Sequence, residues 1–178
     1  MPAHMKDTIA TTYQEMVKHR NVDKITVKDL VEKCGISRQT FYYHFQDITD
    51  VVAWSIQKGL QQSLKLSLEA EDSETALQYF VDVTKENRPI IERLLQSRRR
   101  EQVEVMVLDA IRTFLEELLR HRKPDLQMKD EDLNLALRFA TYGIAGILLD
   151  YRVSVEDEAK LVHKVHQLLD GELFHFDQ

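Results

Sequence analysis

Residues 26–45 carry side chains that are suited to contact with double-stranded DNA. Arg38 can form a bidentate pair with guanine and Gln39 with adenine, so we take both, with Tyr43, as candidates for contacts with base edges. A second group is better suited to phosphate oxygens, which fix the position of a protein on DNA without carrying sequence information. This group consists of Thr26, Lys28, Thr40, Tyr42 and His44.

Two short helices and a tight turn are predicted to position these side chains. The first helix starts after Thr26, a good N-cap, and Gly35 allows a sharp turn at its end. Ser37 then caps the second helix, and we also count it among the predicted DNA-binding residues. Apolar residues recur at helical spacing in both helices, namely Val27, Leu30 and Val31, then Phe41 and Phe45. This pattern predicts a helix-turn-helix, whose second helix can lie in the DNA major groove.

The motif resembles the DNA-binding domain of the TetR family of bacterial transcriptional regulators. The matching residues are Thr26, Val27 and Leu30, then Gly35, Ile36 and Ser37, then Thr40, Phe41, Tyr42, His44 and Phe45. The stretch from Arg38 to Tyr42 is also similar to the subgroup labelled dihydroxyacetone-kinase regulators. The resemblance implies a homodimer on a palindromic operator, controlled by a small-molecule effector. One position departs from the family, because Ile48 stands where a phosphate-contacting lysine is usual.

Composition favours an intracellular helical protein. Glycine and proline are scarce, and the single cysteine, Cys34, excludes an intrachain disulfide and suits a reducing cytoplasm. No apolar run reaches the roughly 18 residues of a membrane span. The first 50 residues hold equal numbers of basic and acidic side chains, so the net charge of −6 belongs to the rest of the chain. An acidic total still permits DNA binding, since only the docking face must be positive.

The apolar spacing predicts an all-α protein of about nine helices. A three-helix head is expected over residues 1–46, and a helical effector-binding and dimerisation body over 47–178. The first helix is expected from about Lys6 to His19. Beyond the motif, helices are expected to begin near Asp47, Ser73, Pro89, Ser97, Leu133 and Ser154.

The last two helices favour dimerisation. The helix over 133–149 is apolar on two sides, and only one amphipathic helix follows to cover it. Two such helices meeting their copies would form a four-helix interface. The alternative is a deeply buried core helix in a monomer. The predicted interface residues are Tyr142, Gly143, Ile144, Gly146, Ile147, Leu161, Val165 and Leu168.

Effector and metal sites are less sharply indicated. Five residues could line an effector cavity, although at helical spacing they are more often plain core: Tyr79, Phe80, Met106, Phe114 and Phe139. His163, His166 and Asp170 share one helical face and could bind zinc in a metal-responsive regulator. They lie opposite the apolar face, where such a cluster is usually plain surface. We therefore expect no metal and no other cofactor.

Three further features also have plainer interpretations. The Tyr43 ring could pack against the first or the fourth helix instead of facing DNA. The same holds for His44, for which the two interpretations carry equal weight. The basic run at 98–100 invites a nucleic-acid interpretation, but a solvated helix start far from the motif explains it better.

An enzyme is not expected. The sequence has no glycine-rich phosphate loop, no nucleophile elbow and no His-Glu-x-x-His pair. The leading hypothesis is therefore a dimeric, ligand-responsive transcriptional regulator in the cytoplasm. Its alternative is a co-regulator that acts mainly through a partner protein and binds DNA weakly, and Ile48 keeps that alternative open.

Overall fold

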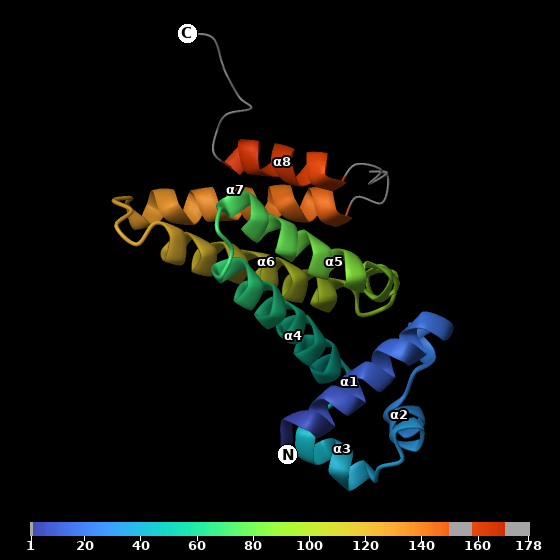
Figure 1. The fold of residues 1–178 in the computed structure, drawn as a ribbon. Coiled ribbons are helices and arrows are strands. Elements are labelled where there is room, and N and C mark those ends of the chain that lie inside the picture. The colour runs from blue at the N-terminus through green and yellow to red at the C-terminus, as the bar shows by residue number, and fades with distance from the viewer. Residues whose placement is uncertain (1, 150–157, 170–178) are drawn as a thin grey trace. The chain divides into compact units, whose positions relative to one another are not determined.

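The computed structural model describes residues 2–149 and 158–169, which form helices and no strand (Figure 1). This confirms the predicted all-α class. The elements are α1 (Pro2–His19), the 3-10 helix η1 (Val22–Lys24), α2 (Val27–Cys34), α3 (Arg38–His44), α4 (Ile48–Leu68), α5 (Ser73–Leu95), α6 (Arg100–Arg122), α7 (Asp130–Leu149) and α8 (Glu158–Leu169).

Pro89 does not begin a helix of its own, so the described residues hold eight α-helices instead of about nine. Pro89 lies inside α5, on its exposed side. Its ring removes one N–H from the helix ladder. The helix continues nonetheless, because Ile90 and Leu94 are buried on the opposite side and need helical backbone to stay there.

Three helix starts also differ from the prediction: α6 begins at Arg100 instead of near Ser97, α7 at Asp130 instead of near Leu133, and α1 earlier than expected. The first helix begins at Pro2 instead of Lys6, which suits proline because the first helical position needs no N–H. The described part of the last helix runs from Glu158, and the predicted start near Ser154 lies outside the described residues.

The chain divides into two compact units. The first holds the described residues up to Lys58 together with Asn87–Val107, and the second holds Gly59–Glu86 together with the described residues from Leu108 onward. Helices α4, α5 and α6 therefore each contribute to both units. The first unit contains more of the chain than the head predicted over 1–46, since parts of α4, α5 and α6 belong to it. The boundary at residue 46 stays a prediction.

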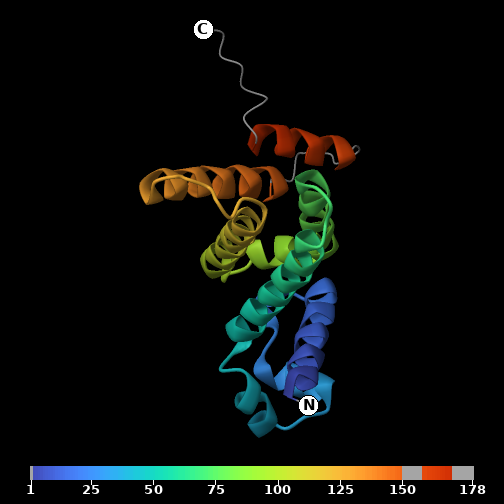
Figure 2. The same ribbon diagram turned by 60° about the vertical axis from the view of Figure 1, so that its left-hand side comes forward.

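The core of the first unit holds the helix-turn-helix in place. The apolar stripe of α1 is fully buried, and α2 packs on both α1 and α3. Figure 2 shows α1 with α2 and α3 around its lower half. The buried side chains include Ile9, Tyr13 and Val17 of α1, Leu30 of α2, Phe41 of α3, and Val51 and Val52 of α4. This core fixes which side of α3 remains free.

The second unit has its own core, built by α5, α6, α7 and α8. Phe80 and Phe114 stack with ring centroids 4.2 Å apart. Around them lie Leu77, Ile111, Leu137, Ile144, Val162 and Val165, all buried. Only one side of α7 contributes to this core.

Candidate nucleic-acid interface

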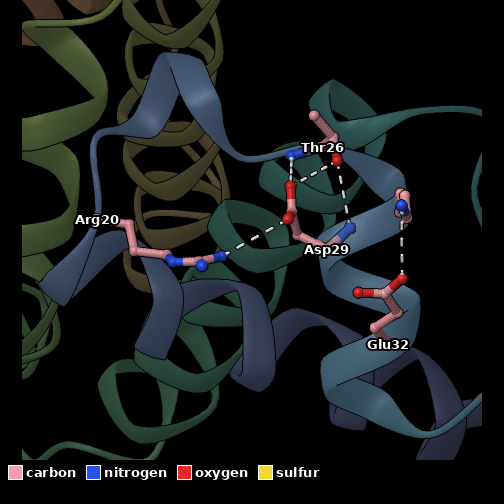
Figure 3. Close-up of polar contacts among 5 residues, drawn as sticks. Arg20, Thr26, Asp29 and Glu32 are labelled. Atoms are coloured by element: carbon pink, nitrogen blue, oxygen red, sulfur yellow. Dashed lines mark hydrogen bonds and ion pairs between the residues drawn. The ribbon is translucent and has the colours of Figure 1, made fainter.

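A capping box fixes the start of α2 (Figure 3). The backbone N–H of Asp29 donates to the Thr26 hydroxyl at 3.2 Å, and the backbone N–H of Thr26 donates to the Asp29 carboxylate at 2.9 Å. The Thr26 hydroxyl donates to the same carboxylate at 2.5 Å. These hydrogen bonds, with Arg20 at 3.8 Å, lower the pKa of Asp29. The Thr26 hydroxyl is therefore committed within the helix end, which limits its predicted role toward phosphate.

The turn between the two helices depends on Gly35. Its φ of 67° lies in the left-handed region, where a side chain would be strained. The N–H of Ile36 then donates to the carbonyl of Val31 at 3.1 Å, closing the end of α2. Ser37 caps α3 by accepting the N–H of Thr40 at 3.0 Å. The helix-turn-helix is thus present as predicted, and Ser37 serves it structurally.

Helix α3 has a buried side and an exposed side. Phe41 and Phe45 are buried, while Tyr42 and Tyr43 are 58% and 79% exposed. Arg38 and Gln39 are also exposed. Lys28 is exposed at the start of α2, and its Nζ lies 4.0 Å from Oε1 of Glu32. An exposed pair of tyrosines on a firmly anchored helix is typical of a binding surface.

The exposed Tyr43 ring does not pack against α1 or α4, so that plainer interpretation is wrong. His44 is half-buried and meets the Tyr43 ring edge-on, with centroids 4.9 Å apart. Both remain predicted DNA contacts. Thr40 is half-buried beside Ser37.

The start of α4 has Ile48 where the family resemblance implies a lysine that contacts phosphate. Ile48 is only 5% exposed and packs in the core of the first unit. The first turn instead carries two carboxylates: Asp47 accepts the N–H of Asp50 at 2.9 Å, and Asp50 accepts the N–H of Gln46 at 3.1 Å. These charges suit the positive end of the helix dipole, but they repel phosphate. The apolar spacing from Ile48 to Val51 and Val52 was the sequence signal for this burial.

The predicted effector residues do not gather at one place. Phe80 and Phe114 lie in the core of the second unit, Tyr79 is half-buried, and Met106 belongs to the first unit. Phe139 is exposed on the outer side of α7. Beside Phe80 is an apolar cavity of about 10 Å³, room for roughly one water molecule. Its lining is Leu77, Phe80, Val81, Ile144, Ile147, Val162 and Val165.

The predicted dimer residues are divided between core and surface. Ile144 and Val165 are buried within the single chain, and Ile147 and Leu168 are half-buried. Tyr142, Gly143 and Gly146 are exposed. Leu161 has no described side chain. Among the described side chains of α7, the large exposed apolar ones that the predicted interface did not include are Leu135 and Phe139.

The histidines of α8 have partners other than a metal. His163 Nδ1 lies 3.1 Å from the Glu74 carboxylate of α5, and His166 also has an interaction of its own. Asp170 lies outside the described residues. Among the residues that are described, no group of three or more potential ligands could hold a metal ion.

Together, a firmly anchored helix-turn-helix and a separate helical unit define a helix-turn-helix regulatory protein. Residues 14–53 match the family model described as bacterial regulatory proteins, tetR family. Residues 71–171 match the model of a transcriptional regulator C-terminal region, TetR_C_8. The chain therefore belongs to the TetR family of bacterial regulators and is a DNA-binding transcriptional regulator. No curated protein matches the sequence.

Solved structures share the fold. The dihydroxyacetone kinase operon activator DhaS is 18% identical with a TM-score of 0.70, over 94% of both chains. A candidate TetR-family regulator from Syntrophomonas wolfei is 15% identical with a TM-score of 0.64, over 99% of this chain and 100% of that one. The fatty acid degradation regulator FadR from Bacillus halodurans is 19% identical with a TM-score of 0.63, over 96% of both chains. At these identities, the likeness shows the fold alone. Among the described helices, none has the length and apolar character that a membrane crossing requires.

Proposed function

We propose that the protein acts in the cytoplasm as a homodimer on a palindromic operator, and that it is not an enzyme. Each copy inserts α3 into the major groove, with Arg38, Gln39 and Tyr43 facing base edges. The observation that carries this proposal is the division of α3 into a buried aromatic side and an exposed polar side. Lys28, Tyr42 and His44 then lie on the same two helices, placed to contact phosphates.

The second copy is proposed to cover the exposed side of α7. Leu135, Phe139 and Tyr142 are 69%, 73% and 56% exposed in the single chain, and Gly143 and Gly146 lie among them. A row of large apolar side chains on one helix is the kind of surface that homodimers bury. This places the proposed interface on the outer side of α7, next to the buried Ile144.

A small molecule is proposed to control DNA binding through the second unit. The cavity beside Phe80 is too small for such a ligand, so binding there requires side chains of α5, α7 and α8 to move apart. The similarity of the Arg38–Tyr42 stretch to dihydroxyacetone-kinase regulators makes small hydroxyketones the first compounds to test. A ligand shifts the equilibrium only by its difference in affinity for the two states.

The proposed operator binding can be tested with a duplex from the region upstream of the gene. Fluorescence anisotropy should give tighter binding to this duplex than to a shuffled duplex of equal composition. An Arg38→Ala and Gln39→Ala double variant is the matched control and should bind both duplexes alike. Equal binding of both duplexes by the unmodified protein would contradict direct operator recognition.

A second candidate function is favoured by the start of α4. Ile48 is buried and the carboxylates of Asp47 and Asp50 lie at the start of α4, which supports weaker phosphate contact there than the family resemblance implies. A co-regulator that needs a partner protein to hold it on DNA would tolerate that weaker contact. Specific binding to the upstream duplex that appears only after a partner protein is added would favour this function.

A further inference from the structure

Residues 93–98, at the end of α5 and in the turn after it, donate hydrogen bonds to the connection between α1 and α2. About 75 residues separate the two segments in the sequence. Arg93 of α5 donates through Nη1 to the carbonyl of Val17 at 2.9 Å, and to the carbonyl of Lys18. The backbone N–H of Arg98 donates to the Asp23 carboxylate at 3.0 Å. All of these residues belong to the first compact unit. The basic run at 98–100 thus lies beside η1, nearer to the motif than its position in the sequence indicates.

Arg93 completes the C-terminal end of α1. The last carbonyls of a helix have no partner within the helix, and the helix dipole makes this end negative. The carbonyl of Met16 accepts the N–H of Arg20 at 2.9 Å, which leaves Val17 and Lys18 for another donor. No glycine follows α1 to close it. The guanidinium of Arg93 supplies both the donors and the positive charge.

Asp23 extends the same contact to the start of α2. Asn21 caps η1 by accepting the N–H of Asp23 at 2.9 Å. The carboxylate of Asp23 is then turned toward Arg98, and Thr26, the N-cap of α2, follows three residues later. The connection from Val17 to Asp23 is therefore held at both ends by residues 93–98.

We propose that Arg93 and Asp23 are positioning residues for DNA binding. They fix the end of α1 and the entry to α2, and so hold α3 in one orientation. The Arg93 guanidinium is engaged by the carbonyls of Val17 and Lys18, and the Asp23 carboxylate would repel phosphate, so we expect neither to contact DNA. The ammonium group of Lys6, near the start of α1, lies over the ring of Phe45 at the end of α3. Val17 lies about 17 Å from Lys6 along the axis of α1.

Four variants test the inference: Arg93→Ala, Arg93→Lys, Asp23→Ala and Asp23→Asn. Arg88→Ala is the matched control, because Arg88 is on the same helix and, among the described residues, forms its ion pair with Glu92 of its own helix. The DNA probe is a duplex that the unmodified protein selects from a randomised pool. Affinity is measured at several salt concentrations, and amide hydrogen exchange is measured over residues 17–26 without DNA.

Arg93→Ala and Asp23→Ala are each expected to weaken binding to the selected duplex about tenfold, as for the loss of one net hydrogen bond to a charged group. Exchange over 17–26 should quicken in both. Arg93→Lys and Asp23→Asn keep a donor and an acceptor, so they should recover part of the affinity. The dependence of affinity on salt should not change, because no phosphate contact is lost.

Unchanged affinity and exchange in both alanine variants would overturn the proposal. A salt slope reduced by about two units in Arg93→Ala would also overturn it, since Arg93 would then be a phosphate contact of the dimer. If Arg93→Ala does not fold, Asp23→Ala decides, because it removes one exposed side chain. If the unmodified protein selects no duplex, the proposed function fails. In that case the exchange measurement still decides whether this contact orders the connection.

Discussion

Phe41 and Tyr42 are neighbours in the sequence, but one is buried and the other is 58% exposed. The helical period places Phe41 and Phe45 on the same side, where the first unit buries them. Tyr42 and Tyr43 are thereby left on the solvent side, next to Arg38. Because the aromatic anchors hold the helix, the exposed residues can be replaced with little effect on folding, so single substitutions can report on DNA recognition.

Replacing Arg38 with alanine should relax recognition at one base pair in each half-site. The expected loss is about 1–3 kcal/mol per half-site, because a bidentate pair with guanine is removed. Tyr42→Phe is the control and should weaken binding to all sequences alike. The measurement compares the selected operator with operators changed at single base pairs. Undiminished discrimination by Arg38→Ala would mean that Arg38 does not read a base.

Restoring the family's lysine with Ile48→Lys should destabilise the protein instead of tightening DNA binding. Ile48 is buried, and a charge placed there costs about 2–3 kcal/mol. Thermal melting without DNA measures this loss. The control is Gln46→Lys, which adds the same charge at an exposed position two residues earlier. An Ile48→Lys variant that melts normally and has a steeper salt slope would show that this side chain can reach phosphate.

Because the chain has few glycines, other groups cap some of its helix ends. Among the described residues, only Gly35 has a positive φ, and it ends α2. At the end of α4, Arg122 takes the place of a glycine cap: its guanidinium donates to the carbonyls of Ser67 and Glu71, each at 3.2 Å, and of Ala70. The Ser67 hydroxyl donates to the carbonyl of Ala76 at 2.7 Å, which fastens α4 to α5. An arginine at the end of α6 therefore closes a helix about 50 residues earlier.

Arg122→Ala should lower the free energy of unfolding by about 2 kcal/mol, since it removes several charge-assisted hydrogen bonds from partly buried carbonyls. Urea unfolding followed by circular dichroism measures the change. Arg120→Ala is the matched control. Arg120 is exposed and, within the described part of the chain, pairs with Glu117 on the same helix, so its replacement should cost less than about 1 kcal/mol. Equal effects of the two variants would argue against a capping role for Arg122.

At the scale of the whole molecule, the exposed side of α7 is the surface that we propose for dimerisation. The helix has two apolar sides, and the second unit buries only the side that carries Leu137 and Ile144. The other side carries Leu135, Phe139 and Tyr142. Leaving these three side chains in water is unfavourable, so a second copy that covers them gains hydrophobic free energy. A homodimer follows from this surface if it packs closely enough.

Phe139→Arg should release monomers that keep their helices, because Phe139 is 73% exposed in the single chain. Ile144→Arg should instead unfold the second unit, since Ile144 is buried there. Light scattering gives the mass and circular dichroism gives the helix content. A Phe139→Arg protein that remains dimeric would place the interface elsewhere.

Gly143→Ala sharpens the test of this interface. A methyl group at Gly143 would meet no atom of its own chain within 4 Å, and alanine favours helix by roughly 1 kcal/mol. The single chain should therefore gain stability. If a partner helix approaches closely at this position, the dimer should nonetheless dissociate at higher concentration than the unmodified protein. Sedimentation over a concentration series distinguishes the two effects.

The helix-turn-helix was predictable because its contacts are local. Thr26 pairs with Asp29, Ser37 with Thr40, and Gly35 closes the helix just before it, so each signal lies within four residues of its partner. The all-α class and the two-sided character of α7 were likewise readable from composition and spacing. These features depend on neighbours along the chain, and the sequence lists those neighbours directly.

Contacts between distant segments decided the rest. Ile48 is apolar in any context, but only the packing of the first unit makes it a core residue instead of an exposed departure from its family. Spacing alone could not tell which side of α7 is covered, because both sides are equally apolar. The partners of Arg93 and Arg122 lie 50 to 76 residues away. Burial and long-range hydrogen bonds depend on which segments meet in space, and that is a property of the tertiary structure.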